Sequence, residues 1–107
     1  NGKVTRSWLG VSVQDITLAD KESLKLGVDQ GSLVREVVVD SPAYKAGLKV
    51  NDVIVEFNGH TINNSRKLPK EVVYTTSGEE VSIKLVREGK AKTVVVILQP
   101  FPEGMMS

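Results

Sequence analysis

Residues 41–54 read Ser41-Pro42-Ala43-Tyr44-Lys45-Ala46-Gly47-Leu48-Lys49-Val50-Asn51-Asp52-Val53-Ile54. Serine followed by proline is typical of a helix N-cap and first helical position, because the first helical N–H needs no partner within the helix. Gly47 predicts that the helix ends after only one or two turns. The run Val53–Phe57 that follows is rich in β-branched and aromatic residues and predicts a strand. This stretch therefore predicts a very short helix that leads into a strand.

Strand patterns continue on both sides of this stretch. Asn58-Gly59 after the strand is a strong hairpin signal. Further strands are expected at Leu9–Gln14, Leu33–Val39, His60–Ile62, Val81–Leu85 and, after a turn at Glu88-Gly89, Thr93–Leu98. With alternation of apolar and polar residues in several of these runs, the pattern favours a small α+β domain of five or six strands with two helices and one helical turn.

Two longer helices are expected. Thr17 can cap the first, which runs through Lys25 and has Gly27 to stop it. Asn64-Ser65 can cap the second, which carries Leu68, Val72 and Val73 on one face. Pro69 fits the first turn of a helix but not its interior. The second helix is therefore expected either to start irregularly or to begin near Leu68.

Length and composition limit the classes of function. The chain has 107 residues, of which 40% are hydrophobic and 25% charged, so it can form one globular domain with a real core. Its net charge of +1, with both signs interleaved, argues against a nucleic-acid or anionic membrane surface. No apolar run approaches the roughly 20 residues that a membrane helix needs, so we expect no direct membrane insertion. We expect an incoming linker at 1–5, the domain at 6–98 and a C-terminal linker or tail at 99–107.

Catalysis by this chain alone is not expected. His60 is the only histidine, and its place after Asn58-Gly59 favours a solvent-exposed turn residue over a general base. The chain has no cysteine, and no cluster suggests a metal site or a cofactor. Ser41 is better explained as a helix cap than as a nucleophile. A binding function fits the sequence better than an enzymatic one.

Trp8-Leu9-Gly10-Val11 is the stretch with binding chemistry. Glycine tolerates positive φ and allows successive backbone N–H groups to converge, here those of Leu9, Gly10 and Val11. Convergent amides bind anions, and Arg6 can reach the same spot directly or through water. The following strand has an edge that can pair with an incoming peptide. The pattern therefore suggests a site for the C-terminal carboxylate of another chain.

The same residues also predict an apolar groove. Val11 and Val13 alternate with Ser12 and Gln14, so one set can line a pocket while the strand edge pairs with a ligand. The helix carrying Leu68 and Val72 supplies the second wall. Burial in an ordinary core is the simpler interpretation for any one apolar position, and Arg6 alone would be a solvated charge. The candidate peptide-binding residues are Arg6, Trp8, Leu9, Gly10, Val11, Ser12, Val13, Leu68, Val72 and Val73.

Residues 41–54 resemble the Ser-Pro-Ala-x-x-Ala-Gly-Leu-x-x-Gly-Asp-x-Ile stretch of PDZ domains. The similarity continues through Phe57-Asn58-Gly59 and Gly78-x-x-Val81, and with the Arg6–Val11 stretch it covers about Arg6 to Leu98. Asn51 replaces the usual glycine of this motif, and asparagine also tolerates positive φ. The resemblance implies the PDZ fold, a partly open antiparallel β-barrel or sandwich with two helices.

The order of the elements resembles the PDZ domains that follow the protease domain in HtrA/Deg-family serine proteases. Only a short linker precedes the carboxylate turn, and Thr93–Leu98 replaces the missing first strand, as in a circular permutation. The resemblance implies a non-catalytic module that binds hydrophobic C-termini or exposed segments of unfolded polypeptides for an attached protease domain, in periplasmic protein quality control. It also implies a monomeric isolated domain in an oligomeric parent protein.

Two alternatives stay open at this point. The module could belong to another envelope protease, of the site-2 or C-terminal processing type, or it could be a stand-alone scaffold. The tail Met105-Met106-Ser107 could occupy the groove of a neighbouring copy, although a frayed end is the simpler interpretation. Trp8 stands where a tyrosine or smaller residue is common in the family, which bears on the depth of the pocket.

Overall fold

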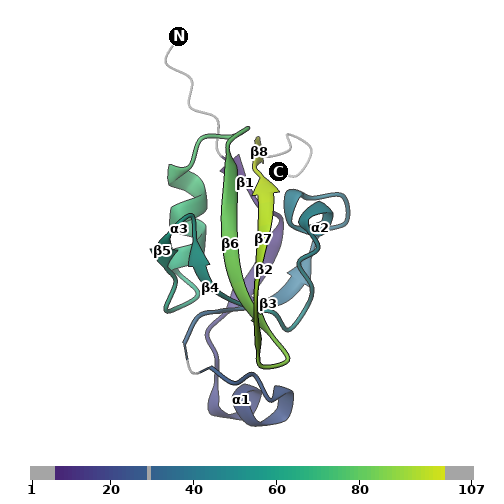
Figure 1. Ribbon diagram of the computed structural model, residues 1–107, viewed down its shortest axis with the longest axis vertical. Coiled ribbons are helices and arrows are strands. Elements are labelled where there is room, and N and C mark those ends of the chain that lie inside the picture. The colour runs from purple at the N-terminus through teal and green to yellow at the C-terminus, as the bar shows by residue number, and fades with distance from the viewer. Residues whose placement is uncertain (1–6, 29, 101–107) are drawn as a thin grey trace, which may run out of the picture.

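The computed structural model describes residues 7–28 and 30–100, which form a mostly antiparallel β-sheet with three helices (Figure 1). The strands are β1 (Ser7–Trp8), β2 (Val11–Gln14), β3 (Ser32–Val37), β4 (Val53–Phe57), β5 (His60–Thr61), β6 (Glu80–Arg87), β7 (Lys90–Ile97) and β8 (Gln99–Pro100). The helices are α1 (Leu18–Leu24), α2 (Pro42–Ala46) and α3 (Lys67–Tyr74). The predicted α+β class is confirmed.

The main sheet has the strand order β2-β3-β4-β6-β7, and β5 pairs with β4 beside this path. β1 and β8 form a separate two-stranded pair in which Ser7 lies opposite Pro100 and Trp8 opposite Gln99. The two ends of the described fold therefore lie side by side, while α1 lies at the opposite end of the domain (Figure 1). β7 completes the sheet by pairing with β6, which confirms the expected role of the last strand.

The local signals of glycine, proline and asparagine are confirmed at the turns. Asn58 and Gly59 both have positive φ, 51° and 86°, as a tight two-residue hairpin requires. Glu88 and Gly89, with φ of 53° and 78°, form the same kind of turn between β6 and β7. Asn51 has φ 78°, so its tolerance of the left-handed region is used as predicted.

The predicted caps of α1 and α2 are also confirmed. Thr17 Oγ1 accepts the Asp20 N–H at 3.0 Å while the Asp20 carboxylate accepts the Thr17 N–H, which makes a capping box. Ser41 Oγ accepts the Tyr44 N–H at 3.1 Å, with proline at the first helical position. Gly47 then ends α2 in the left-handed region.

Several boundaries predicted from the sequence are wrong; β6 and β7, for example, span Glu80–Arg87 and Lys90–Ile97 rather than Val81–Leu85 and Thr93–Leu98. α1 ends at Leu24, because Lys25 itself adopts the left-handed C-cap conformation, with φ 50°, two residues before Gly27. β3 ends at Val37, opposite the first residue of β2, and the chain then turns at Asp40, whose φ is 67°. β2 begins at Val11 rather than Leu9. Gln99 and Pro100 form β8 opposite β1 instead of belonging to a tail.

The core lies between the sheet, α2 and α3. Its fully buried centre includes Phe57, Ile62 and Leu85, and both Leu68 and Val72 of α3 project into it. A smaller cluster around Leu26, Leu33 and Val53 packs under the segment that contains α1. Tertiary packing of this kind is the main reason why short helices such as α2 and α3 are stable.

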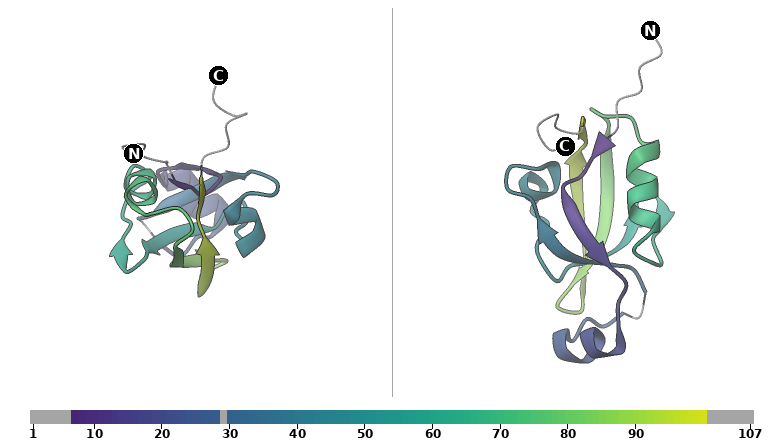
Figure 2. Two further views of the ribbon diagram at one scale, coloured as in Figure 1. Left: turned by 90° about the horizontal axis from the view of Figure 1, so that it is seen from above. Right: turned by 180° about the vertical axis from the view of Figure 1, so that it is seen from behind.

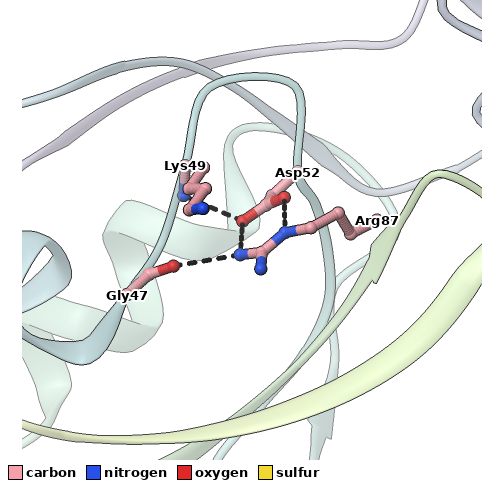
Figure 3. Close-up of polar contacts among 4 residues, drawn as sticks. All are labelled: Gly47, Lys49, Asp52 and Arg87. Carbon is pink, nitrogen blue, oxygen red and sulfur yellow. Dashed lines mark hydrogen bonds and ion pairs between the residues drawn. The ribbon is translucent and has the colours of Figure 1, made fainter.

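A buried ion pair joins the end of β6 to the segment between α2 and β4 (Figure 3). Arg87 donates to both carboxylate oxygens of Asp52, at 2.8 and 2.7 Å, and also to the Gly47 carbonyl at 2.9 Å. The Lys49 N–H donates to the same carboxylate at 2.9 Å. The Asp52 side chain is 1% exposed, so these bonds replace its lost hydration.

None of the helices within 7–28 and 30–100 has the length and apolar character to span a membrane.

Candidate functional site

An apolar groove of about 180 Å³ lies between α3 and the β1–β2 segment. In Figure 2 (right) the purple β1–β2 segment runs beside the green α3, and the groove lies between them. One wall comes from the N-terminal segment and the other from a helix more than fifty residues later in the chain. The lining residues are Ser7, Trp8, Leu9, Gly10, Val11, Val13, Leu68, Pro69, Val72 and Val73.

The loop Trp8–Val11 forms one end of the groove, which we call the closed end. Two backbone hydrogen bonds fix this loop on the side that faces away from the groove. The Ala43 N–H donates to the Leu9 carbonyl at 2.9 Å, and the Val38 N–H donates to the Gly10 carbonyl at 2.8 Å. The C=O and N–H of a trans peptide point in opposite directions. The N–H groups of Gly10 and Val11 therefore point away from α2 and Val38, toward the groove. Two successive amides aimed at one spot make an anion-binding concavity.

Gly10 is required at this position for two reasons. Its φ is +89°, which disfavours any residue with a side chain. An added Cβ would lie 2.1 Å from Ser41 Cβ and 3.3 Å from the Trp8 ring. The close approach of Gly10 to Ser41 thus lets the loop pack on the N-terminus of α2.

β2 offers its second edge to a ligand. In the sheet order it is the outermost strand, and within the described residues it pairs with β3 alone. Because the Val38 N–H bonds to the Gly10 carbonyl, Val11 and Val37 form a non-hydrogen-bonded pair. The N–H and C=O of Val11 therefore face away from β3, along the groove side of the strand.

The solvent exposure of the lining side chains increases from the floor of the groove to its rim. Leu9, Leu68 and Val72 are buried, Val11 and Val13 are half-buried, and Val73 is 51% exposed. The floor of the groove is therefore continuous with the hydrophobic core, while its rim is open to solvent. A cavity of this size and lining suits an aliphatic side chain at the closed end.

The structure brings together most of the residues singled out by sequence. Eight of the ten predicted site residues line the groove. Ser12 does not, because it lies on the other face of β2 opposite Glu36, and Arg6 lies outside the described residues. Ser7 and Pro69 line the groove but were not predicted as site residues. The alternation of β2 carried no signal for Ser7, which lies in a separate strand.

Pro69 is accommodated at the third residue of α3. Asn64 Oδ1 accepts the N–H groups of Arg66, the N-cap residue, and of Lys67, the first helical residue, at 3.0 and 3.1 Å. A proline in the first turn lacks only an N–H that would have no helical partner. The alternative that the helix begins near Leu68 is confirmed, and Pro69 contributes to the groove wall.

His60 and Ser41, which the sequence analysis considered for catalysis, lie outside the groove. His60 lies at the hairpin tip, where its Nδ1 is 2.9 Å from Glu71 Oε1 of α3, and its side chain is 64% exposed. Ser41 caps α2 and is fully buried. Among residues 7–28 and 30–100, His and acidic side chains form no cluster of three or more that could hold a metal ion.

An open edge strand, an apolar cavity and inward-facing amides at its closed end together define a domain with a groove for an extended polypeptide end. Comparison with known proteins agrees, because residues 7–98 match the family described as PDZ domain. The chain belongs to the PDZ domain family.

The chain is similar to segments of longer proteins named "Probable periplasmic serine endoprotease DegP-like". It is 45% identical to the one from Marinomonas sp. (strain MWYL1) over 102 residues, covering 95% of this chain and 22% of that protein. It is 43% identical to the one from Hahella chejuensis (strain KCTC 2396) over 101 residues, covering 94% and 22%. The chain thus spans about a fifth of the length of these relatives.

Solved structures show the same relationship. "HtrA-type protease AlgW with decapeptide" superposes with a TM-score of 0.87 at 33% identity, covering 95% of this chain and 31% of that chain. The same protease with a tripeptide gives a TM-score of 0.78 at 36% identity, covering 96% and 35%. The HtrA3 PDZ domain bound to a phage-derived ligand is 23% identical with a TM-score of 0.77, covering 96% and 95%, and supports the fold. The sequence-based resemblance to PDZ domains of HtrA-type proteases is confirmed.

Proposed function

We propose that this domain binds apolar C-termini of other polypeptides by strand addition to β2. The ligand runs antiparallel to Val11–Gln14, with its terminal carboxylate on the amides of Gly10 and Val11. Its last side chain enters the cavity between Leu9, Leu68 and Val72. The observation that carries this proposal is the pair of hydrogen bonds from Ala43 and Val38, which turn those amides toward the groove.

The peptides present in similar solved structures support a peptide ligand for this domain. AlgW has been solved with a tripeptide and with a decapeptide, and the HtrA3 PDZ domain with a pentapeptide ending in valine. The four-residue β2 suits an extended segment of similar length to the shorter of these ligands. A small interface must offset the entropy of ordering a flexible peptide, so we expect a Kd on the order of micromolar or weaker.

We further propose that the domain serves an HtrA-type serine protease of the periplasm, as substrate-recognition or regulatory module. The relatives with this segment are named periplasmic serine endoproteases, which favours this parent over a site-2 or processing protease or a stand-alone scaffold. The domain itself contributes no catalytic group in this proposal. The contribution of Arg6 to carboxylate binding stays a prediction from the sequence, because Arg6 lies outside the described residues.

A pair of matched peptides tests carboxylate recognition. One is an otherwise polar pentapeptide that ends in Val, and the other is its C-terminally amidated twin, which has the same side chains but no terminal charge. Isothermal titration should give binding of the free acid and at least tenfold weaker binding of the amide. Equal affinities would exclude the carboxylate site. The proposed role in an HtrA-type protease needs a separate test. The domain is joined to an HtrA protease domain, and the rate of substrate cleavage is measured with and without the peptide.

A further inference from the structure

We propose that two hydrogen bonds, one at each end of the groove, fix the distance between its walls and so set the size of the last side chain that it accepts. The inference rests on the proposed function of the groove as a peptide site. The two bonds join Ser7 to Thr75 and Asp15 to Ser65. We call the four residues the groove frame.

The bond at the closed end comes from Ser7. This residue is 4% exposed, immediately precedes the Trp8–Val11 loop, and donates its hydroxyl to the Thr75 carbonyl at the C-terminus of α3. Thr75 is itself fixed to the helix, because its hydroxyl donates to the Glu71 carbonyl at 2.8 Å and its N–H to the Val72 carbonyl at 3.2 Å. The carboxylate loop is thereby tied to the last turn of α3.

The bond at the open end comes from Asp15. This residue directly follows β2, and its Oδ1 accepts the Ser65 N–H at 2.8 Å. The next two N–H groups, of Arg66 and Lys67, are taken by Asn64. Asp15 therefore ties the end of β2 to the residue that immediately precedes the N-cap of α3. The Ser65 N–H also lowers the pKa of the Asp15 carboxyl, because the bond favours its charged form.

The two ties enclose the whole groove. One wall runs from Ser7 to Asp15 and the other from Ser65 to Thr75, and every lining residue falls within these two segments. α3 is a helix, so it is not joined to the edge of β2 by a strand ladder. Widening the groove requires α3 to move away from β2, and each tie opposes that motion at its own end.

A frame of this kind makes the groove preorganised for one range of sizes. Binding a small aliphatic end then costs little reordering of the walls, whereas a large aromatic end must stretch or break a tie. Loss of the ties should weaken binding of a Val-terminated peptide and relax the discrimination against Phe. A net hydrogen bond corresponds to about a three- to tenfold change in an equilibrium constant, which sets the expected scale.

The test compares three peptides on matched variants. The peptides are identical except for a last residue of Ala, Val or Phe. The variants Ser7→Ala, Asp15→Ala and the double variant remove the ties. Thr76→Ala is the control at the closed end, because Thr76 is the exposed residue that follows Thr75 and its side chain takes part in neither tie. Thr17→Ala is the control for an exposed side chain to backbone bond outside the groove.

We expect the ratio of Val to Phe affinity to fall at least threefold in the double variant and to stay unchanged in both controls. Hydrogen exchange of the α3 amides in the free domain should accelerate in the tie variants and in neither control. An unchanged ratio in a folded double variant would overturn the proposal. If the double variant does not fold, the ratio of Val to Phe affinity is measured on Asp15→Ala alone, because the Asp15 side chain is exposed. An unchanged ratio in that variant would overturn the proposal in the same way.

These readouts separate the two proposals. If the unsubstituted domain binds none of the three peptides, the proposed function fails. Exchange of α3 in the free domain then still reports on the frame. Unchanged exchange in Ser7→Ala and Asp15→Ala would overturn the frame whatever the peptides do.

Discussion

The α-carbon of Gly10 packs directly against the side chain of Ser41, so that a Cβ added to Gly10 would lie 2.1 Å from Ser41 Cβ. Ser41 has a second role, since its hydroxyl caps α2. Ala43, two residues later, holds the Leu9 carbonyl. The N-terminus of α2 is thus the support on which the carboxylate loop rests. The two stretches most informative in the sequence, residues 8–11 and 41–54, are in direct contact.

Substitution of Gly10 tests this contact. Gly10→Ala combines an unfavourable positive φ with overlap against Ser41, and we expect a loss of about 2–5 kcal/mol in the free energy of unfolding. Gly78→Ala is the matched control, because Gly78 has φ +90° but open space around its α-carbon. It should lose only about 1–2 kcal/mol. Urea unfolding measures both, and equal losses would show that the Ser41 contact has no energetic weight.

Val73 offers a substitution that separates binding from stability. Its side chain lines the groove but is half-exposed, so Val73→Ala should change the free energy of unfolding by less than about 0.5 kcal/mol. Removal of two methyl groups from the wall should weaken binding of a Val-terminated peptide by about two- to fivefold. The neighbouring Tyr74→Ala, on an 84% exposed side chain outside the groove, is the control. Equal effects of the two variants would exclude Val73 from the site.

Features with a local cause could be predicted from the sequence. Thr17 and Ser41 cap their helices through bonds to residues three positions away, and Asn58-Gly59 acts through its own positive φ angles, so these features are visible in a short window. Both groove walls followed from alternation in β2 and from helical spacing in α3. The resemblance to a known family then indicated that the two walls form one site.

Features that depend on distant partners could not be predicted. Ser7 is 68 positions from Thr75, and Asp15 is 50 positions from Ser65, so neither tie has a signature near the residue that makes it. β8 exists because β1 is there to pair with it. The end of α1 was missed for a different reason: Lys25 adopts the left-handed C-cap conformation, although Gly27, which also has a positive φ of 78°, follows two residues later.

The Asp52–Arg87 pair predicts an asymmetric response to truncation. Arg87→Ala leaves a buried carboxylate that still accepts the Lys49 N–H, and we expect a loss of about 3–5 kcal/mol in the free energy of unfolding. Asp52→Ala leaves a guanidinium that is 23% exposed and can be hydrated, so the loss should be smaller, about 2–3 kcal/mol. The double variant should be less destabilised than the sum of the two. Urea unfolding of all three forms checks this, and additive losses would contradict coupling across the pair.

Acid should destabilise the domain through Asp15 and Asp20. Their carboxyl groups have pKa values lowered from 3.8, because Asp15 accepts the Ser65 N–H and Asp20 accepts the Thr17 N–H. The unfolded chain therefore takes up these protons at higher pH than the folded domain does. The stability that both groups contribute is complete above about pH 5 and is lost as the pH falls through 3.8 toward the lowered folded values. Urea midpoints between about pH 6 and pH 2 should decline less steeply for Asp15→Asn/Asp20→Asn than for the unsubstituted domain, because asparagine keeps an acceptor oxygen but does not titrate. Parallel declines would show that these two bonds add no pH-dependent stability.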